Sequence, residues 1–241
     1  MSVIQIISAM NREDNLVVKA VAREKNKIAL VADRLVDCLR NGGRLFFIGA
    51  GTSGRLGVLE AAELPPTFGT EPRIAQCIMA GGRKAVFRSQ EGAEDNEVRA
   101  RHEVRKRVRK GDLVIGIAAS GVTPFVGAAL RESSIIGAET ALVTCSAGFS
   151  DARTARTVIT LRVGPEIVSG STRLKSGTAT KMALNMITTS AMVKLGKVFG
   201  NRMVDLQPKS RKLRERGVRL VQELAKVSRS GAIALLSKSG W

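Results

Sequence analysis

Five short apolar runs separated by longer segments of helical character constrain the fold of this chain more than any other feature. The runs have the length and composition of buried strands and are residues 44–50, 73–79, 112–120, 140–146 and 156–163. The segments between them that favour helix are 54–64, about 93–109, and 124–132. Strands that alternate with helices form a parallel sheet with helices on both faces. The sequence therefore predicts an α/β fold, a three-layer αβα sandwich around a five-stranded sheet.

Helical periodicity continues on both sides of this α/β core. Apolar residues at helical spacing predict one helix over 14–41, which the Asn-Gly-Gly of 41–43 would end. A second long helix is expected from about 171, capped early by Ser or Thr and ended by Gly200. A basic amphipathic helix over roughly 209–226 and a short helical segment follow.

Composition and cysteine usage limit the class of protein. With 241 residues and 44% hydrophobic residues, the chain can bury a substantial core, which argues against a disordered protein. Cys38, Cys77 and Cys145 have no CxxC spacing, so we expect neither a disulfide framework nor a zinc cluster. No apolar run approaches the roughly 20 residues that cross a bilayer, and no signal peptide pattern opens the chain. We therefore expect a cytoplasmic protein with no membrane partner.

The formal charge of +18 raises the question of nucleic acid binding. Residues 99–110 hold seven Lys or Arg against one Glu, and residues 202–241 hold ten against three acids. Neither segment interleaves aromatic residues or zinc ligands, and neither contains a helix-turn-helix pattern. We interpret both as solvated basic faces and expect no specific nucleic acid partner. Attraction of anionic substrates and adventitious nucleic acid binding are the alternatives.

The loop after the first predicted strand has the composition of an anion site. Residues 51–54 read Gly-Thr-Ser-Gly and open the next helix. Glycines let the backbone approach an anion, helix N–H groups favour negative charge, and Thr52 and Ser53 add hydroxyl donors. The loop is not a Walker loop, and it matches a dinucleotide fingerprint only partly. A phosphate cradle and a merely tight strand-to-helix turn both remain open for this loop alone.

The same design recurs twice along the chain. The third predicted strand delivers Ser-Gly-Val-Thr-Pro at 120–124, where Ser120 and Thr123 offer hydroxyls and the proline suits the first turn of a helix. A third hydroxyl-rich start, Ser-Thr-Arg-Leu-Lys at 171–175, precedes the long helix. Three polar helix entrances fit a sugar phosphate better than a dinucleotide.

Two groups of carboxylates are candidates for acid-base chemistry. Glu63 is expected in the last turn of a helix that Pro65 and Pro66 must end, where the helix dipole disfavours a negative charge and so favours a general acid. An exposed glutamate at a helix terminus is the alternative.

The second group is the acidic cluster of Glu91, Glu94 and Asp95 at a helix start, where acids commonly act as caps. The chain has one histidine, His102, expected to be solvated, and no tyrosine. An acid-base enzyme built from this chain must therefore use carboxylates.

Long blocks of the sequence resemble the N-acetylmuramic acid 6-phosphate etherase family, within the sugar isomerase (SIS) superfamily that also includes the glucokinase regulatory protein. The blocks, in order, are "MNREDNLVVKAV", "GAGTSGRLGVLEAAELPPTFG", "AGGRKAVFRSQEGAEDN", "VIGIAASGVTPFVGAAL", "GPEIVSGSTRLKSGTATKMALNMITTSAM" and "GKVFGNRMVDLQPKSRKL". The resemblance implies a homodimeric carbon-oxygen lyase with a five-stranded parallel sheet. Such an enzyme cleaves the lactyl ether of N-acetylmuramic acid 6-phosphate, giving N-acetylglucosamine 6-phosphate and D-lactate, without metal or organic cofactor.

The resemblance also assigns residues. The family's catalytic glutamates fall on Glu63, before "PPTFG", and on Glu94, inside "EGAED", and its phosphate-binding hydroxyls fall on Ser53 and Ser120. The further positions expected to bind substrate or phosphate are Thr52, Gly54, Gly121, Thr123 and Lys175. Val122 stands where the family usually has arginine, the segment "CSAGFS" at 145–150 differs from the usual loop, and the chain is shorter than usual members.

The resemblance also suggests a division of the chain and two competing functions. We expect residues 1–201 to form the SIS domain with its N-terminal helix, and residues 202–241 to form a short basic helical extension. A sugar phosphate isomerase would use the same loops and one glutamate, without needing Glu63. A sugar phosphate sensor would keep the hydroxyl loops and lose the acid-base pair. Because both glutamates are present, we favour the etherase.

Overall fold

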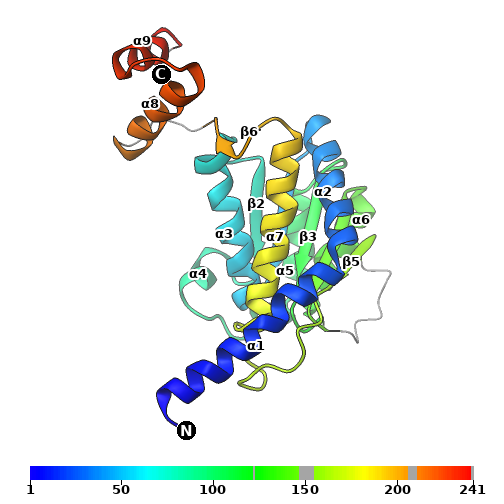
Figure 1. Ribbon diagram of the computed structural model, residues 1–241. Helices are drawn as coiled ribbons and strands as arrows, with labels where there is room; N and C mark the ends of the chain where they lie inside the picture. The colour runs from blue at the N-terminus through cyan, green and yellow to red at the C-terminus, as the bar shows by residue number, and fades with distance from the viewer. Residues whose placement is uncertain (122, 147–154, 206–210, 240–241) are drawn as a thin grey trace.

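The computed structural model describes residues 1–121, 123–146, 155–205 and 211–239 (Figure 1). A single five-stranded sheet lies at the centre of this part of the chain. Its strands are β1 (Leu45–Gly49), β2 (Ala75–Met79), β3 (Leu113–Ile117), β4 (Glu139–Thr144) and β5 (Thr157–Thr160). They lie in the order β2-β1-β3-β4-β5, and each neighbouring pair is parallel. The predicted five-stranded parallel sheet is confirmed.

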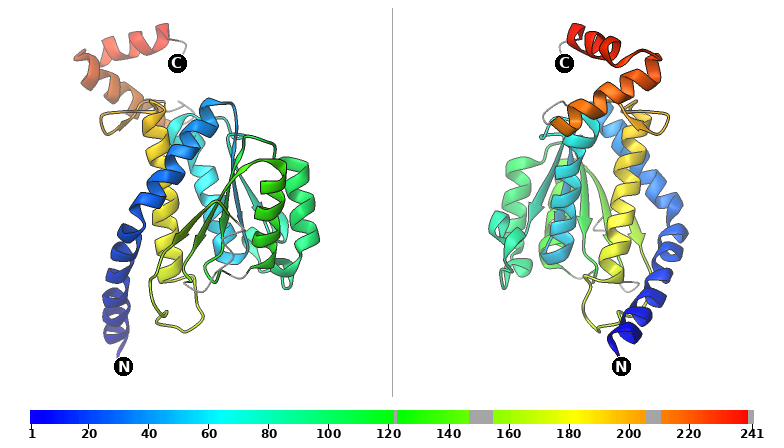
Figure 2. Two further views of the ribbon diagram at one scale, coloured as in Figure 1. Left: turned by 90° about the vertical axis from the view of Figure 1, so that its right-hand side faces the viewer. Right: turned by 60° about the vertical axis from the view of Figure 1, so that its left-hand side comes forward.

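Helices cover both faces of the sheet, as the alternation of elements predicts (Figures 1 and 2). The helices of one face are α2 (Lys25–Arg40), α3 (Gly51–Phe68) and α7 (Lys175–Lys194). The helices of the other face are α5 (Glu97–Arg107) and α6 (Pro124–Ile136). A short helix, α4 (Gly82–Phe87), contacts α3 and β2 at the edge of the sheet. The three-layer αβα sandwich is therefore confirmed.

Alternating strand side chains build one hydrophobic core on each face. Leu45 and Phe47 of β1 belong to the core under α2, α3 and α7, whereas Phe46 and Ile48 belong to the core under α5 and α6. Gly57 lets α3 approach the sheet closely, because a Cβ atom there would lie 2.8 Å from Cβ of Phe47. The position of α3 matters for function, since this helix carries two of the predicted site residues.

The helix expected over 14–41 is in fact two helices. α1 (Val3–Arg23) ends and α2 begins at Glu24, whose φ of −98° and ψ of 8° depart from helical values. The residues around the break are polar or charged and carry no apolar side chain that would hold the turn against the core. α1 therefore turns away from the sheet and packs along α7, burying Val17, Ala20 and Val21. Its first half projects beyond the sheet (Figure 2).

The prediction that Pro65 and Pro66 end their helix is wrong. α3 continues through both prolines to Phe68 and ends at Gly69, which has the left-handed φ of 64°. Leu64 and Phe68 are buried, so packing of the last turn against the core outweighs the two missing backbone N–H groups.

The long helix expected over 171–200 is shorter at both ends. α7 begins at Lys175 without a side-chain cap from its N-cap residue Leu174, and ends at Lys194. A two-stranded hairpin of β6 (Val198–Phe199) and β7 (Arg202–Met203) follows, and Gly200 supplies the positive φ of its turn.

Two C-terminal helices lie apart from the sheet and pack on each other (Figures 1 and 2). They are α8 (Arg211–Ala225) and α9 (Arg229–Lys238). Their place agrees with the expectation of a basic helical extension, and a boundary at residue 201 stays a prediction.

Candidate functional site

The loop between β1 and α3 forms the first part of the candidate site. Gly51 has a φ of 53° and opens α3, and the first intrahelical bond runs from Gly54 N–H to the carbonyl of Ala50 at 3.1 Å. The N–H groups of residues 51–53 therefore have no carbonyl partner within the helix. Gly54 is required here, because a Cβ atom would lie 2.7 Å from the carbonyl oxygen of Gly49. Thr52 and Ser53 are half-buried in this turn, as an anion cradle needs.

The loop between β3 and α6 forms the second part. Gly121 has a φ of 77°, and its N–H bonds to the carbonyl of Ala118 at 2.9 Å. Thr123 is the N-cap of α6 with extended backbone, and Pro124 occupies the first turn, as predicted. Ser120 is exposed at the carboxyl end of β3. Because β1 and β3 are neighbours in the sheet, the two hydroxyl loops open side by side. Val122 lies outside the described residues, as does most of the 145–150 segment.

A cavity of about 200 Å³ joins Glu94 to the first loop. Its lining residues are Ala50, Gly51, Arg55, Met79, Ala80, Ala85, Ser89, Gln90, Glu91, Gly92, Ala93 and Glu94. Glu94 itself is exposed and lies in a short 3-10 turn, η1 (Ala93–Asp95). The structure thus brings together Glu94 and the Gly51 loop, although more than forty residues separate them in the sequence.

The helix expected from about 93 begins later, and its cap is another residue. α5 starts at Glu97, and the side chain of Asn96 accepts a hydrogen bond from the N–H of Arg99 at 2.8 Å. The capping role considered for the acidic cluster therefore belongs to Asn96, which leaves Glu94 available for chemistry.

Arg55 positions the wall of this cavity, and sequence reasoning missed it. Its guanidinium Nε donates to the carbonyl of Val86 at 2.8 Å, and its Nη2 donates to the carbonyl of Ala85 at 2.9 Å. These bonds tie the first turn of α3 to the end of α4, just before the segment that carries Glu94. An arginine that directly follows a glycine and hydroxyl loop is the only sequence signal of this role.

The start of α7 reaches the same edge of the sheet, but a carboxylate already occupies its amides. Glu166 accepts from the N–H of Lys175 at 3.0 Å and from the N–H of Ser176 at 2.9 Å. The hydroxyls of residues 171 and 172 therefore do not cap this helix, and the third polar entrance is closed by Glu166. A Cβ atom on Gly177 would lie 3.9 Å from Thr52, so α7 borders the first loop.

Lys175 lies near the site, yet its side chain is only 1% exposed. Its ammonium Nζ is 2.5 Å from the carboxylate of Glu13 on α1. This ion pair anchors α1 to the start of α7. In this arrangement Lys175 positions α7 beside the first loop, and its predicted contact with substrate would require a change of partner.

Glu63 lies apart from these loops. It is exposed on α3 and does not line the cavity that contains Glu94. It follows Gly51 by twelve residues, which at the rise of an α-helix places it about 18 Å further along the axis. Glu63 was predicted to be a general acid because it was expected in the last turn of its helix. α3 continues to Phe68, so Glu63 is not in the last turn and that reason does not apply. The catalytic role of Glu63 therefore rests on the family pattern alone.

A second acid on α3, Glu60, is buried and was not foreseen. Its carboxylate accepts from Asn185 Nδ2 at 2.6 Å and from the Thr188 hydroxyl at 2.5 Å, which joins α3 to α7. Burial raises the pKa of the Glu60 carboxyl above its ordinary value, although these hydrogen bonds oppose the shift. No sequence signal distinguishes this buried acid from the exposed Glu63 one turn away.

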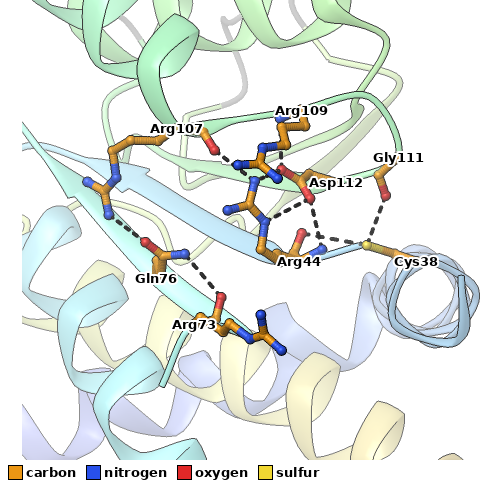
Figure 3. A network of polar contacts seen from close by, with 8 residues as sticks. All are labelled: Cys38, Arg44, Arg73, Gln76, Arg107, Arg109, Gly111 and Asp112. Atoms are coloured by element: carbon orange, nitrogen blue, oxygen red, sulfur yellow. Dashed lines mark hydrogen bonds and ion pairs between the residues drawn. The ribbon is translucent and has the colours of Figure 1, made fainter. Parts of the chain in front are cut away.

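The opposite, amino edge of the sheet carries a polar network with a structural role (Figure 3). Asp112 accepts from the backbone N–H of Arg44 at 2.9 Å and from its guanidinium at 2.8 Å. Arg107 donates to Gln76 at 3.0 Å, and both arginines lie over the Phe46 ring. The basic 99–110 segment is therefore partly structural, which corrects its interpretation as a wholly solvated face.

The cysteines of the chain are free, and His102 is exposed as expected. Burial raises the pKa of the Cys38 thiol to about 11 and that of Cys77 to about 12, so neither forms a nucleophilic thiolate near neutral pH. Within the described residues, no three His, Cys, Asp or Glu side chains gather as metal ligands. The same part of the chain has no helix long and apolar enough to span a membrane.

Comparison with known proteins agrees with this fold. The SIS domain model matches residues 88–190, and the model of the glucokinase regulatory protein N-terminal SIS domain matches residues 27–134. A phosphoheptose isomerase from Neisseria gonorrhoeae is 16% identical, with a TM-score of 0.60 over 77% of this chain and 99% of that one. A phosphoheptose isomerase from Francisella tularensis is 19% identical, with a TM-score of 0.58 over 78% of this chain and 100% of that one. The five-stranded parallel sheet and the helices that cover it form a SIS fold.

Closer relatives specify the family. An N-acetylmuramic acid 6-phosphate etherase of Symbiobacterium thermophilum is 46% identical over 99% of this chain and 80% of that protein. Etherases of the same name from Clostridium beijerinckii and Geobacillus thermodenitrificans are 47% and 48% identical, over 100% and 93% of this chain and 79% and 76% of theirs. The chain belongs to the N-acetylmuramic acid 6-phosphate etherase family.

Proposed function

We propose that this chain is a carbon-oxygen lyase that cleaves the D-lactyl ether of N-acetylmuramic acid 6-phosphate, giving N-acetylglucosamine 6-phosphate and D-lactate. The observation that carries the proposal is the cavity that joins Glu94 to the Gly51 loop, beside the Ser120 loop. The names of the relatives, at nearly half identity over most of their length, support the substrate.

The two hydroxyl loops bind the phosphate of the substrate. Amide N–H groups of residues 51–53 and the hydroxyls of Ser53 and Ser120 donate to its oxygens, with Thr52 and Thr123 as neighbouring donors. The phosphate takes no part in bond breaking. Its binding energy instead fixes the sugar carbons against the catalytic groups.

Glu94 is the base that begins the reaction. In the open-chain sugar the C1 aldehyde acidifies the proton on C2, and a carboxylate within reach removes it. Glu94 lies in the same cavity as the phosphate loop, which suits this role. Its exposure on a short turn leaves the carboxylate accessible to substrate.

Glu63 is the acid that completes elimination. The lactyl oxygen leaves C3 and takes a proton from this residue, which forms an unsaturated aldehyde. Water then adds at C3, with the roles of the two glutamates reversed. The reaction needs one acid and one base at different atoms, which accounts for two glutamates in different segments.

The setting of the enzyme follows from the same chemistry. The product is an amino sugar phosphate, so the reaction serves the recycling of cell-wall amino sugars. Three free cysteines fit a reducing, cytoplasmic compartment.

We further propose that the enzyme is a homodimer, since apolar side chains of α1 and α7 such as Val18 (60% exposed) and Val193 (48% exposed) face solvent in one copy.

A coupled assay of D-lactate from N-acetylmuramic acid 6-phosphate tests the proposed function. The purified protein is expected to release lactate and the amino sugar phosphate in equal amounts. An isomerase would exchange the C2 hydrogen with solvent without releasing lactate. A sensor would bind the sugar phosphate and do neither, so either pattern would refute the etherase.

A further inference from the structure

A groove follows the open edge of the sheet, on the outer side of β2. This strand ends the order β2-β1-β3-β4-β5, so one of its edges has no neighbouring strand. A cavity of about 900 Å³ lies along that edge. It is lined by β2 itself, by α3 and α5 on either side of the strand, and by α4, which follows the strand at its carboxyl end. We call this cavity the β2 groove. It is distinct from the smaller cavity that contains Glu94.

The floor of the β2 groove is backbone with free hydrogen-bonding capacity. Successive residues of a strand direct their N–H and C=O groups to alternate edges. The carbonyl of Ile74 accepts from the first residue of β1, and the N–H of Ala80 donates to the last. The odd-numbered residues between them, Ala75, Cys77 and Met79, therefore direct their backbone groups away from β1, and all three line the groove.

Arg107 occupies one of these outward groups. Its Nη1 donates to the carbonyl of Cys77 at 3.2 Å, and its Nη2 donates to the side chain of Gln76 at 3.0 Å (Figure 3). A carboxylate is a stronger acceptor than either oxygen, so an incoming acid can take over this guanidinium. The outward N–H groups of Cys77 and Met79 have no acceptor in the part of the chain that the structure describes.

The two long walls of the groove differ in chemistry. The α3 wall carries small apolar side chains such as Val58 and Ala61. The α5 wall carries Arg99 and Arg107, with Glu103 as the one acid among the lining residues, paired with Arg99 at 2.6 Å. The α5 wall therefore has a net positive charge, and it faces a wall without charge across the strand.

The shape of the groove excludes β2 of a second copy as its occupant. Ala75 and Met79 are only 5% and 8% exposed, so β2 lies at the bottom of the groove between two helices. Paired strands lie about 4.8 Å apart, whereas packed helix axes need about 8–10 Å. Pairing β2 with β2 would bring α3 against α3, and would also place the like charges of two α5 walls together. A single extended strand has no such helices and fits between the walls.

We propose that the β2 groove binds an extended peptide segment of another protein, in which apolar and acidic residues alternate. The segment adds to the sheet beside β2, and its backbone pairs with the outward groups of Cys77 and Met79. Side chains of a strand face opposite sides of the sheet in turn, so one set packs on the α3 wall and the other meets Arg99 and Arg107. β2 has five residues, which sets the length of the segment at about five or six. The proposal does not depend on the etherase reaction.

A panel of synthetic peptides tests the proposal. Each is a hexapeptide with blocked ends that alternates Val, Ile or Leu with Asp or Glu, and fluorescence anisotropy measures its binding to the purified protein. At least one is expected to bind one site per chain with a Kd below about 100 μM, which is about −5.5 kcal/mol. The same panel with lysine in place of the acids should not bind. Failure of the whole acidic panel, or equal binding of the lysine panel, would overturn the proposal.

Methylation of the peptide backbone tests strand pairing separately from charge. The tightest acidic peptide, methylated at its backbone nitrogens, keeps every side chain and loses its N–H donors. Its binding is expected to be lost, because main-chain hydrogen bonds supply the affinity of an added strand. Unchanged binding of the methylated peptide would show that no strand is added, and the proposal would be wrong.

Charge reversal in the protein locates the peptide. Arg83 and Arg99 are exposed and line the β2 groove, so Arg83→Glu/Arg99→Glu should weaken binding of the acidic peptide about 10-fold or more. Lys106→Glu/Lys110→Glu makes the same change of charge at exposed positions outside the groove, and is the matched control. Circular dichroism checks that both variants fold. Equal weakening in the two variants would mean attraction by net charge alone, which would overturn the proposal.

Hydrogen exchange and light scattering complete the test. In the complex, the amides of Cys77 and Met79 are expected to exchange more slowly, because they become donors to the added strand. Protection elsewhere without protection of β2 would contradict the proposal. If Arg83→Glu/Arg99→Glu changes the mass of the protein in light scattering and leaves peptide affinity unchanged, the occupant is a second copy, and the peptide proposal is wrong.

Discussion

Ser53 and Ser120 stand at the ends of neighbouring strands, and each is expected to donate one hydrogen bond to the phosphate. A donor to a charged acceptor contributes about 1.5 to 3 kcal/mol, so Ser53→Ala and Ser120→Ala should each raise KM about 10-fold to 150-fold, with a smaller effect on kcat. Ser134→Ala, on an exposed part of α6, is the matched control. Calorimetry that finds unchanged sugar phosphate affinity in both variants would remove the cradle assignment.

Replacing Glu94 or Glu63 by glutamine is expected to affect different steps of the reaction. Glu94→Gln should abolish lactate release and also the exchange of the C2 hydrogen with deuterated solvent, because both begin with proton removal. In Glu63→Gln the rate of ether cleavage should fall roughly 10²- to 10⁴-fold, as is usual for loss of a general acid. This variant should still exchange the C2 hydrogen with solvent. Mass spectrometry of recovered substrate measures the exchange. Lactate release at the wild-type rate from Glu63→Gln would show that Glu63 is not the acid.

Residues with local signals could be predicted from the sequence, and residues with distant partners could not. The hydroxyl loops follow their strands directly, so Ser53 and Ser120 were visible in the pattern. Arg55 and Glu166 act on carbonyl or amide groups that lie far along the chain or around a loop. Their roles depend on the tertiary path, which no local pattern contains.

At the scale of elements, the contact between α3 and α7 depends on the buried Glu60. Because its folded-state pKa is raised, the stability that this carboxyl contributes is present below the ordinary glutamate pKa and is lost as pH rises through the folded value. Glu60→Gln removes this loss. The free energy of unfolding of this variant, relative to wild type, should therefore increase as the pH rises above the ordinary glutamate pKa of 4.5.

Urea unfolding at a series of pH values measures this difference, and Glu63→Gln, exposed on the same helix, is the control. If the free energies of unfolding of wild type and Glu60→Gln differ by the same amount at every pH, the buried Glu60 carboxyl is not the cause of the pH dependence.

Element types were predictable, while several boundaries were not. The spacing of apolar residues predicted the strands and most helices, because the residues of a buried face recur at regular intervals along the chain. The prolines of α3 led to a wrong prediction of where the helix ends. Burial of Leu64 and Phe68 stabilises the last turn more than the two prolines destabilise it. The break at Glu24 depends on where α1 docks, which the continuous periodicity of 14–41 does not reveal.

At the scale of the whole molecule, exposed apolar surface predicts self-association. Val3, Ile4 and Ile7 of the projecting half of α1 are 72%, 66% and 54% exposed, which is unfavourable in an isolated copy. Light scattering at micromolar concentration should give twice the chain mass of 25.7 kDa. A monomeric mass would contradict the dimer.

The source of the oxygen in the products tests the central claim most directly. When the reaction runs in H₂¹⁸O, elimination and hydration place the heavy oxygen on C3 of N-acetylglucosamine 6-phosphate and leave D-lactate unlabelled. Fragment ions that exclude C1 separate this label from exchange of the aldehyde oxygen. The account predicts one heavy oxygen at C3 for each lactate released. Label in the lactate, or no lactate at all, would contradict it.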